Sequence, residues 1–152
     1  QVYDLANRDE TYDLVLFMGV FYHLRYPMLA LDIVAQKVKR MMVFQTLTMP
    51  GKEVYTNTDG LDIESREPML EPGWPKMAFI EHRFAGDPTN WWAPNHACVE
   101  AMLRASGLKV AKALPHELYL AEPDPEHPSS VMTWNREEIL AATGANVHRN
   151  QP

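Results

Sequence analysis

Polar side chains with catalytic potential follow directly after an apolar run at residues 14–21. The run contains Gly19, and Tyr22, His23 and Arg25 come next. In an open α/β sheet, ligands bind outside the carboxyl ends of the strands, so polar groups at that point are candidates for a ligand site. The alternative is that Tyr22 and His23 are half-buried residues whose hydrogen bonds go to backbone groups.

Two adjacent tryptophans form a second candidate site. Trp91 and Trp92 precede Pro94 and Asn95. An indole can stack on a flat substrate or close over a cofactor, because its face is apolar and its edge carries an N–H donor. The alternative is that the pair anchors a loop to the core. We expect Asn95 to cap a helix that follows it.

The spacing of histidine and cysteine does not indicate a metal site. The six histidines form no H-E-x-x-H motif. The adjacent pairs Glu81–His82 and His116–Glu117 would point to opposite faces of a strand. We therefore expect no structural or catalytic metal. Cys98, the single cysteine, is expected to be a small buried hydrophobe in the first turn of a helix.

The elements that position these residues follow from apolar patterning. The run at 14–21 predicts a strand buried on both faces, which is typical of parallel sheets. VYDL at 2–5 predicts a short strand, and RMMVFQTLT at 40–48 predicts another. Pro27 is suited to the first turn of a helix, which we expect to run through 28–40 and end in a basic turn. Strand, helix and strand form a βαβ unit.

The remainder of the chain predicts one long excursion and a second set of elements. Residues 50–90 are rich in proline and hold four of the seven glycines, which is typical of a lid or binding loop, part of it a hairpin. We expect a helix at 96–106, a strand at 108–114 with a continuation at 117–121, and a last helix at 134–144. Asn135 and Glu138 have capping-box spacing in that helix.

These elements predict an α/β fold, with a mainly parallel sheet, helices on its faces and an inserted lid at 50–90. We expect one α/β domain over 1–121, followed by a proline-rich linker, a short helix and a tail over 122–152. The length of 152 residues fits this single domain.

Composition excludes several classes of protein. The net charge of −6 disfavours binding to nucleic acid, which needs a positive surface. A single cysteine excludes an intramolecular disulfide and favours a reducing compartment. No apolar run approaches the ~18 residues of a membrane span, and no signal-peptide pattern opens the chain. We therefore expect a cytoplasmic protein.

Two of these motifs resemble a known family. GVFYHLRYPMLAL at 19–31 is similar to a strand and helix of class I S-adenosylmethionine-dependent methyltransferases. More narrowly, it resembles the tRNA wobble-uridine carboxymethyltransferase branch, which carries a MGVLYH-type run before a proline-started helix. NWWAPN at 90–95 resembles the aromatic–proline turn of that branch. The resemblance covers 1–121 and implies a Rossmann-like methyltransferase fold.

The resemblance also implies a cofactor and roles for individual residues. The cofactor would be S-adenosylmethionine or its carboxy derivative. Methyl transfer needs the nucleophile, methyl carbon and sulfur to be aligned in a dry pocket, which an aromatic floor and a lid would supply. The implied roles are cofactor binding at Tyr3, Asp4, Met18, Gly19 and Tyr22, catalysis at Tyr22 and His23, and substrate binding at Trp91, Trp92 and Asn95.

The sequence departs from this family at its glycines. No two of the seven have G-x-G spacing, so the Gly-rich cofactor loop is absent and the chain resembles the C-terminal portion of a methyltransferase domain. We expect a methyltransferase, or the greater part of one, that acts on a small molecule rather than tRNA. The alternative is a catalytically silent remnant that acts by binding or self-association. Strand faces left open by a missing half predict a homodimer.

Overall fold

A computed structural model describes residues 1–56 and 61–145. The first half of the chain contains η1 (Val2–Asn7), β1 (Tyr12–Met18), η2 (Phe21–His23), α1 (Pro27–Ala35) and β2 (Val38–Gln45). The second half contains η3 (Glu67–Leu70), β3 (Met77–Phe79), β4 (Trp92–Pro94), α2 (His96–Ala105), β5 (Leu108–Leu114), β6 (Leu118–Pro123), α3 (Ser130–Trp134) and α4 (Arg136–Thr143). No helix among the described residues has the length and apolar character that crossing a membrane requires.

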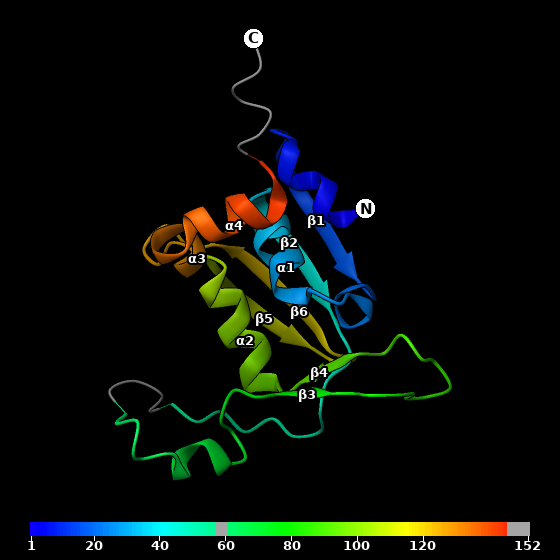
Figure 1. Cartoon of the computed structure of the whole chain (residues 1–152), viewed down its shortest axis with the longest axis vertical. Coiled ribbons are helices and arrows are strands. Elements are labelled where there is room, and N and C mark those ends of the chain that lie inside the picture. The colour runs from blue at the N-terminus through cyan, green and yellow to red at the C-terminus, as the bar shows by residue number, and fades with distance from the viewer. Residues whose placement is uncertain (57–60, 146–152) are drawn as a thin grey trace.

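A four-stranded sheet with the order β1-β2-β6-β5 forms the centre of this α/β fold (Figure 1). The predicted βαβ unit is confirmed, because β1 and β2 are parallel and α1 connects them. The sheet differs from the mainly parallel one expected, since β6 is antiparallel to both β2 and β5. A tight turn joins β5 to β6, and such a turn can only connect antiparallel strands.

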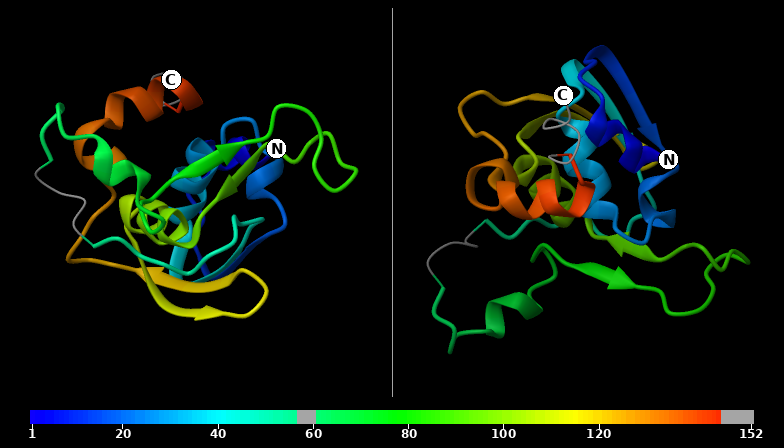
Figure 2. Two further views of the ribbon diagram at one scale, coloured as in Figure 1. Left: turned by 90° about the horizontal axis from the view of Figure 1, so that it is seen from below. Right: turned by 45° about the horizontal axis from the view of Figure 1, so that its top comes forward.

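The core lies between this sheet and helices α1 and α2. Phe44 is at its centre, with its ring centroid 5.8 Å from that of Phe17, 5.4 Å from Phe21 and 6.4 Å from Tyr119. The described helices lie on one side of the sheet (Figure 2, left). On the opposite side, apolar residues of β1 stay in water, and Leu16 is 65% exposed.

The predicted strand at VYDL is instead η1, a 3₁₀ helix. Val2, Leu5 and Ala6 have the i, i+3, i+4 spacing that places apolar side chains on one helical face. Val2 and Leu5 pack against the core from that face. The segment therefore buries its apolar side chains against the core without joining the sheet.

Helix α1 is shorter than the sequence predicts. It ends at Ala35, and Val38 already begins β2. Lys39 and Arg40 therefore lie on a strand, and the predicted basic last turn of the helix is wrong. The pairing of β1 with β2 explains the early end, because Tyr12 N–H donates to the Lys37 carbonyl at 2.8 Å.

The excursion between β2 and α2 contains the expected hairpin. β3 and β4 are antiparallel, with Phe79 opposite Trp92, and they lie beyond the carboxyl ends of β1 and β2 (Figure 1). Met49 N–H donates to the Pro94 carbonyl at 2.8 Å, so the excursion leaves and re-enters the body of the protein at one point. Its role as a lid stays a prediction.

The C-terminal elements agree in part with the sequence. The predicted continuation of the strand at 108–114 is a separate strand, β6. Gly144 ends α4 in the left-handed conformation, as expected. Asn135 contacts Glu138 through its side chain at 3.1 Å, without the backbone bond of a capping box. The predicted tail at 147–152 lies outside the described residues.

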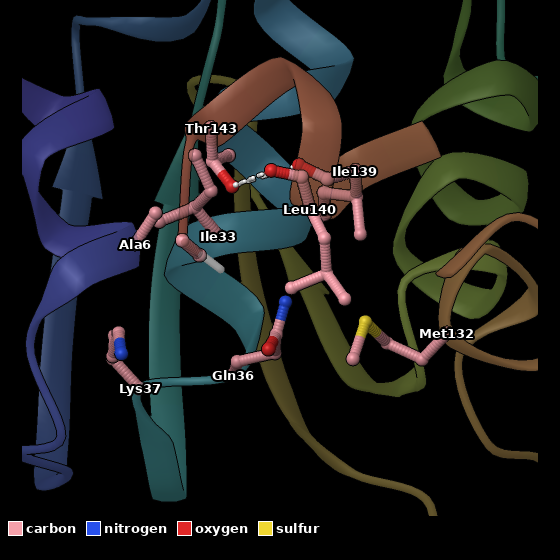
Figure 3. Close-up of a pocket in the computed structure, with 9 residues that line it drawn as sticks. Ala6, Ile33, Gln36, Lys37, Met132, Ile139, Leu140 and Thr143 are labelled. Atoms are coloured by element: carbon pink, nitrogen blue, oxygen red, sulfur yellow. Dashed lines mark hydrogen bonds between the residues drawn. The ribbon is translucent and has the colours of Figure 1, made fainter. Parts of the chain in front are cut away.

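Helix α4 packs beside η1 and α1 and leaves a gap between them (Figure 3). The gap has a volume of about 40 Å³ and is lined mainly by aliphatic side chains, Ile33 and Leu140 among them. That volume is close to the ~30 Å³ share of one water molecule, so the gap is too small for a substrate.

Candidate functional site

The two motifs that carry the sequence resemblance meet in the structure. Gly19, with φ of +66°, lets the chain turn at the end of β1 into η2. Trp91 N–H then donates to the Tyr22 carbonyl at 2.9 Å. The indole N–H of Trp92 donates to the Leu24 carbonyl at 3.0 Å. Tyr22 and the two tryptophans therefore lie together at the carboxyl end of β1. That they line one shared cleft stays a prediction.

His23 is oriented by a loop of the hairpin. Its Nδ1 lies 3.0 Å from Thr89 Oγ1 and 3.2 Å from the Thr89 carbonyl oxygen. Thr89 donates both its N–H and its hydroxyl to Asp87, each at 2.7 Å, and these bonds lower the pKa of Asp87. Since the Thr89 hydroxyl proton is used on Asp87, Nδ1–H of His23 is the donor. Nε2 of His23 then carries the free lone pair and is able to accept a proton.

Aromatic rings and one cation cover the outside of this junction. The Arg25 guanidinium lies 5.1 Å from the Trp91 ring centroid and 5.3 Å from that of Phe79. The Trp91 and Phe79 rings are nearly parallel, at 9°. These cation–π contacts hold the hairpin against η2. They support the anchoring alternative for the tryptophans, and their predicted contact with substrate stays a prediction.

Sequence reasoning missed Phe79 and Thr89, which belong to the same cluster. Phe79 lies opposite Trp92 in the β3–β4 pair. Thr89 follows Asp87 at the i+2 spacing of an Asx-turn. The Asp-x-Thr spacing was the only signal in the sequence, and it predicts a turn rather than a contact with a histidine.

The residues predicted to bind a cofactor fall into two groups. Met18 and Gly19 lie at the carboxyl end of β1 beside η2. Tyr3 and Asp4 lie on η1 and line a cavity of about 460 Å³ together with Tyr26. Phenol rings beside a carboxylate suit a nucleoside, whose base stacks and whose ribose hydroxyls donate hydrogen bonds. The available residues therefore fit the adenosine part of the implied cofactor.

Asn95 is buried, and hydrogen bonds within the chain occupy its whole amide. Oδ1 accepts from Cys98 N–H at 2.9 Å and from Lys76 N–H at 3.2 Å. Nδ2 donates to the carbonyls of Trp74 at 2.6 Å and Pro72 at 3.4 Å. The predicted helix cap is confirmed. An amide makes four such bonds, so this side chain keeps no free polar atom for the substrate contact predicted for it.

Cys98 behaves as the sequence predicts. It is buried in the first turn of α2 and packs in the core. Burial raises the pKa of its thiol to about 11. A thiol that keeps its proton at neutral pH is a poor nucleophile, so Cys98 has a packing role.

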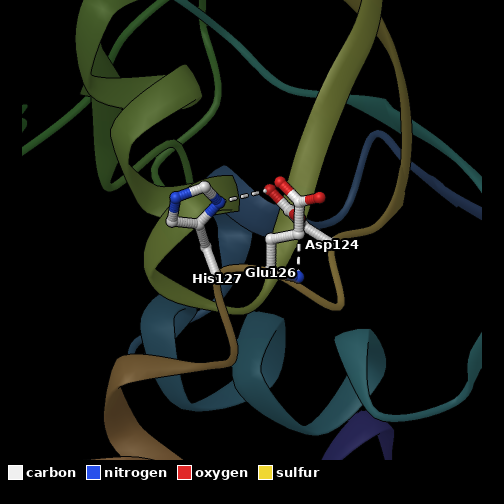
Figure 4. Close-up of side chains that lie close together, drawn as sticks. All are labelled: Asp124, Glu126 and His127. Atoms are coloured by element: carbon white, nitrogen blue, oxygen red, sulfur yellow. Dashed lines mark hydrogen bonds and ion pairs between the residues drawn. The ribbon is translucent and has the colours of Figure 1, made fainter.

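Among the described residues, one group of side chains has the composition of a metal site, although the spacing of histidine and cysteine predicts none. Asp124, Glu126 and His127 lie within 4.8 Å of one another after β6 (Figure 4). His127 Nδ1 is 3.0 Å from Asp124 Oδ2, and this bond lowers the pKa of Asp124. Glu126 N–H donates to Asp124 Oδ1 at 3.1 Å. These bonds are those of an Asx-turn and explain the cluster without an ion.

Comparison with known proteins gives only remote similarities. No family model and no curated protein matches the sequence. Magnesium protoporphyrin IX methyltransferase (ChlM) from Synechocystis PCC 6803, with SAH bound, is similar at 17% identity and a TM-score of 0.45, over 80% of this chain and 49% of that one. The N-terminal domain of EvdMO1, with SAH and D-fucose, is similar at 18% identity and a TM-score of 0.41, over 78% and 49% of the two chains.

The chain therefore spans about half the length of the structures it resembles. Because these TM-scores lie below 0.5, the similarity assigns neither a family nor an activity to this α/β chain.

Proposed function

We propose that the chain is an S-adenosylmethionine-dependent methyltransferase, or part of one, and that it acts on a small molecule. The contact between the two motifs carries this proposal. MGVFYH and NWWAPN resemble the same family from distant parts of the sequence, and Trp91 N–H bonds to the Tyr22 carbonyl. A shared location is what a common ligand site requires, and the carboxyl end of β1 is where α/β sheets bind ligands.

The residues would divide the work of methyl transfer as follows. When bound, the cofactor supplies a methyl group on a sulfonium. Tyr3 and Asp4 hold the adenosine part, and Met18 and Gly19 contact the remainder at the end of β1. Nε2 of His23 accepts the proton that the acceptor loses, because the bond from Nδ1–H to Thr89 orients the ring. Alignment and exclusion of water then provide most of the rate increase.

A small-molecule acceptor is favoured over tRNA by charge. The chain carries a net charge of −6. Binding to RNA relies on Lys and Arg contacts with phosphates, and an acidic protein repels them at long range.

Calorimetric titration with S-adenosylmethionine tests the proposal. We expect a dissociation constant in the micromolar range, and we expect Asp4→Asn and Tyr22→Ala each to weaken binding by about tenfold or more. Asp9→Asn is the matched control, because Asp9 is exposed and lies outside the residues that line the cavity. Absence of heat at millimolar cofactor would contradict the proposal.

A second candidate function, self-association without catalysis, is favoured by one observation. β1 is an edge strand of the sheet, and its outward face exposes Leu14 by 56%, Leu16 by 65% and Met18 by 44%. Exposed edges pair with other chains, and apolar patches mark interfaces. We propose that two copies bury this face in a homodimer.

Light scattering tests this second function. The unmodified chain is expected at twice the monomer mass, and Leu16→Lys is expected at the monomer mass. Lys39→Glu on β2 is a control that changes an exposed charge without adding one to the apolar face. A monomeric unmodified chain that binds no apolar dye would refute self-association.

A further inference from the structure

A second cavity lies at the same edge of the sheet as the candidate site, but on different elements. It has a volume of about 540 Å³ and is bounded by the segment after β2, the first turn of α2 and the β5–β6 turn. The ends of these elements meet at the lower edge of the sheet in Figure 1. Its polar and charged lining residues are Thr48, Lys52, His96, His116, Glu117 and Tyr119. None of these residues belongs to the candidate site formed by η2 and the β3–β4 hairpin.

The β5–β6 turn that forms one wall is strained. His116 and Glu117 both have φ of +60°, the left-handed region that glycine adopts readily and that L side chains rarely adopt. The connection has three residues, 115–117, and turn positions with positive φ favour Gly or Asn. Strained backbone of this kind is concentrated at functional sites, where other contacts hold it in place.

Glu117 supplies that holding contact. Its Oε1 accepts the backbone N–H and the hydroxyl of Thr48, each at 2.8 Å. The contact ties the turn to the segment after β2. The two Thr48 donors also partly offset the negative charge of the Glu117 carboxylate.

The histidine on the floor of the cavity is likewise occupied. His96 Nδ1 is 2.9 Å from the Tyr119 hydroxyl, and Nε2 is 3.4 Å from a Glu100 oxygen. Burial and the nearby carboxylates of Glu100 and Glu117 raise the pKa of Tyr119 to about 12, so its hydroxyl keeps its proton. One ring nitrogen of His96 thus contacts this hydroxyl, and the other faces Glu100. One oxygen of Glu117 and one of Glu100 therefore have partners within the protein.

Two side chains at the rim of the cavity can donate hydrogen bonds to an anion. Lys52 and His116 are exposed at its rim. Ala113, Leu114 and Pro115 form an apolar wall. A lysine ammonium and an imidazole facing an apolar wall suit a molecule with an oxyanion at one end and a hydrophobic body.

We propose that this cavity binds the acceptor substrate, a small molecule whose carboxylate or phosphate contacts Lys52 and His116 while its apolar part lies against Leu114 and Pro115. The role of the bound molecule as methyl acceptor rests on the proposed methyltransferase function, whereas the binding of an oxyanion in this cavity does not. The position at the carboxyl ends of β2 and β5 places the cavity at the sheet edge that also carries Tyr22 and His23.

The test uses three probes that share one ring: benzoate, phenyl phosphate and neutral benzamide. Titration followed by ¹⁵N–¹H NMR is expected to shift amide signals of the 113–119 turn with benzoate or phenyl phosphate, and not with benzamide. The tighter of the two anions identifies the oxyanion. We expect Lys52→Ala and His116→Asn each to weaken binding about fivefold or more. Asn tolerates the left-handed conformation, so His116→Asn preserves the turn.

The control is Lys109→Ala, which removes a lysine of β5 that pairs with Glu122 at 3.3 Å outside the cavity. It is expected to leave probe binding unchanged. Absence of binding at ~10 mM probe, or equal binding by the double variant of Lys52 and His116, would overturn the proposal.

Titration of the same samples with S-adenosylmethionine separates the two proposals. If the cofactor binds and no anion does, the cavity assignment fails alone. If an anion binds and the cofactor does not, the cavity is an anion site and the acceptor assignment fails with the proposed function.

Discussion

Replacing Asn95 by alanine is expected to loosen the protein at two places at once. The cap bond to Cys98 N–H begins α2, and the bonds to Lys76, Trp74 and Pro72 tie the excursion to that helix. Loss of an N-cap costs about 1 kcal/mol. Each well-formed hydrogen bond lost from a part-buried group costs about 1 kcal/mol more, which gives a total of about 2–4 kcal/mol.

Urea unfolding followed by tryptophan fluorescence measures this change. Asn95→Asp is the informative partner variant, because it keeps the acceptor oxygen for Cys98 and Lys76 but turns a second carboxylate oxygen toward the carbonyls of Trp74 and Pro72. We expect it to cost at least as much as Asn95→Ala, since a buried carboxylate oxygen faces two acceptors there. Asn7→Ala, at an exposed residue of η1, is the control and is expected to change stability by less than ~0.5 kcal/mol. A loss below that value for Asn95→Ala would refute the assigned contacts.

Three further predictions concern backbone strain, close packing and a buried thiol. His116→Gly is expected to raise the urea midpoint by relieving about 1 kcal/mol of left-handed strain, and a lower midpoint would contradict the assignment of the turn. Gly107→Ala is expected to lower the free energy of unfolding by about 1–3 kcal/mol, because φ is +82° and a Cβ would lie 2.9 Å from Ser129 N. The thermal midpoint should fall accordingly, and an unchanged midpoint would argue against that packing. Burial raises the pKa of Cys98 from 9.0 to about 11, so the folded thiol stays protonated where the unfolded one ionises, and stability should fall as pH rises through that interval. At pH 8 the folded protein should therefore react with a disulfide reagent about a hundredfold more slowly than in urea, and equal rates would contradict burial of the thiol.

The sequence was most informative where apolar periodicity and a local stop signal agree. The apolar run before Gly19 correctly predicts β1, and Asn95 with the following amphipathic pattern correctly predicts the start of α2. Helix α2 buries the side chains that define its pattern. The run of β1 was expected to be buried on both faces, and this is wrong, because Leu14, Leu16 and Met18 are exposed on the outer face of the sheet. Local information was therefore sufficient to place the two elements but not to predict the burial of both strand faces.

Prediction failed where a tertiary contact decides between two local conformations. VYDL has the composition of a strand, yet its apolar residues also fit one helical face, and packing against α1 selects the helix. The pairing of β2 with β1 takes over residues that the sequence assigns to the end of α1. The end of β5 at Leu114 was predicted correctly, but the left-handed backbone of His116 and Glu117 was not, since neither residue type favours that conformation.

The candidate site was predictable only in outline. The positions of Tyr22 and Trp91 after a strand and before a helix indicated a common edge of the sheet, and their backbone bond agrees. The orientation of His23 depends on Thr89, which is distant in the sequence and belongs to a loop with no chemical signature. Such contacts follow from the fold as a whole, so no local pattern predicts them.

The bond between Met49 and Pro94 has a consequence for how this protein can change over time. Because the two ends of the excursion meet, the geometry of the sheet requires only that these ends are connected and does not depend on the number of residues between them. Each doubling of such a loop costs only about 0.6 kcal/mol of closure entropy. Insertions in the excursion that leave the contacts of residues 72–76 and 89–92 in place are therefore nearly neutral for the fold, and the remaining stretches of the excursion are where descendants of one ancestral chain can acquire different ligands while keeping the same sheet.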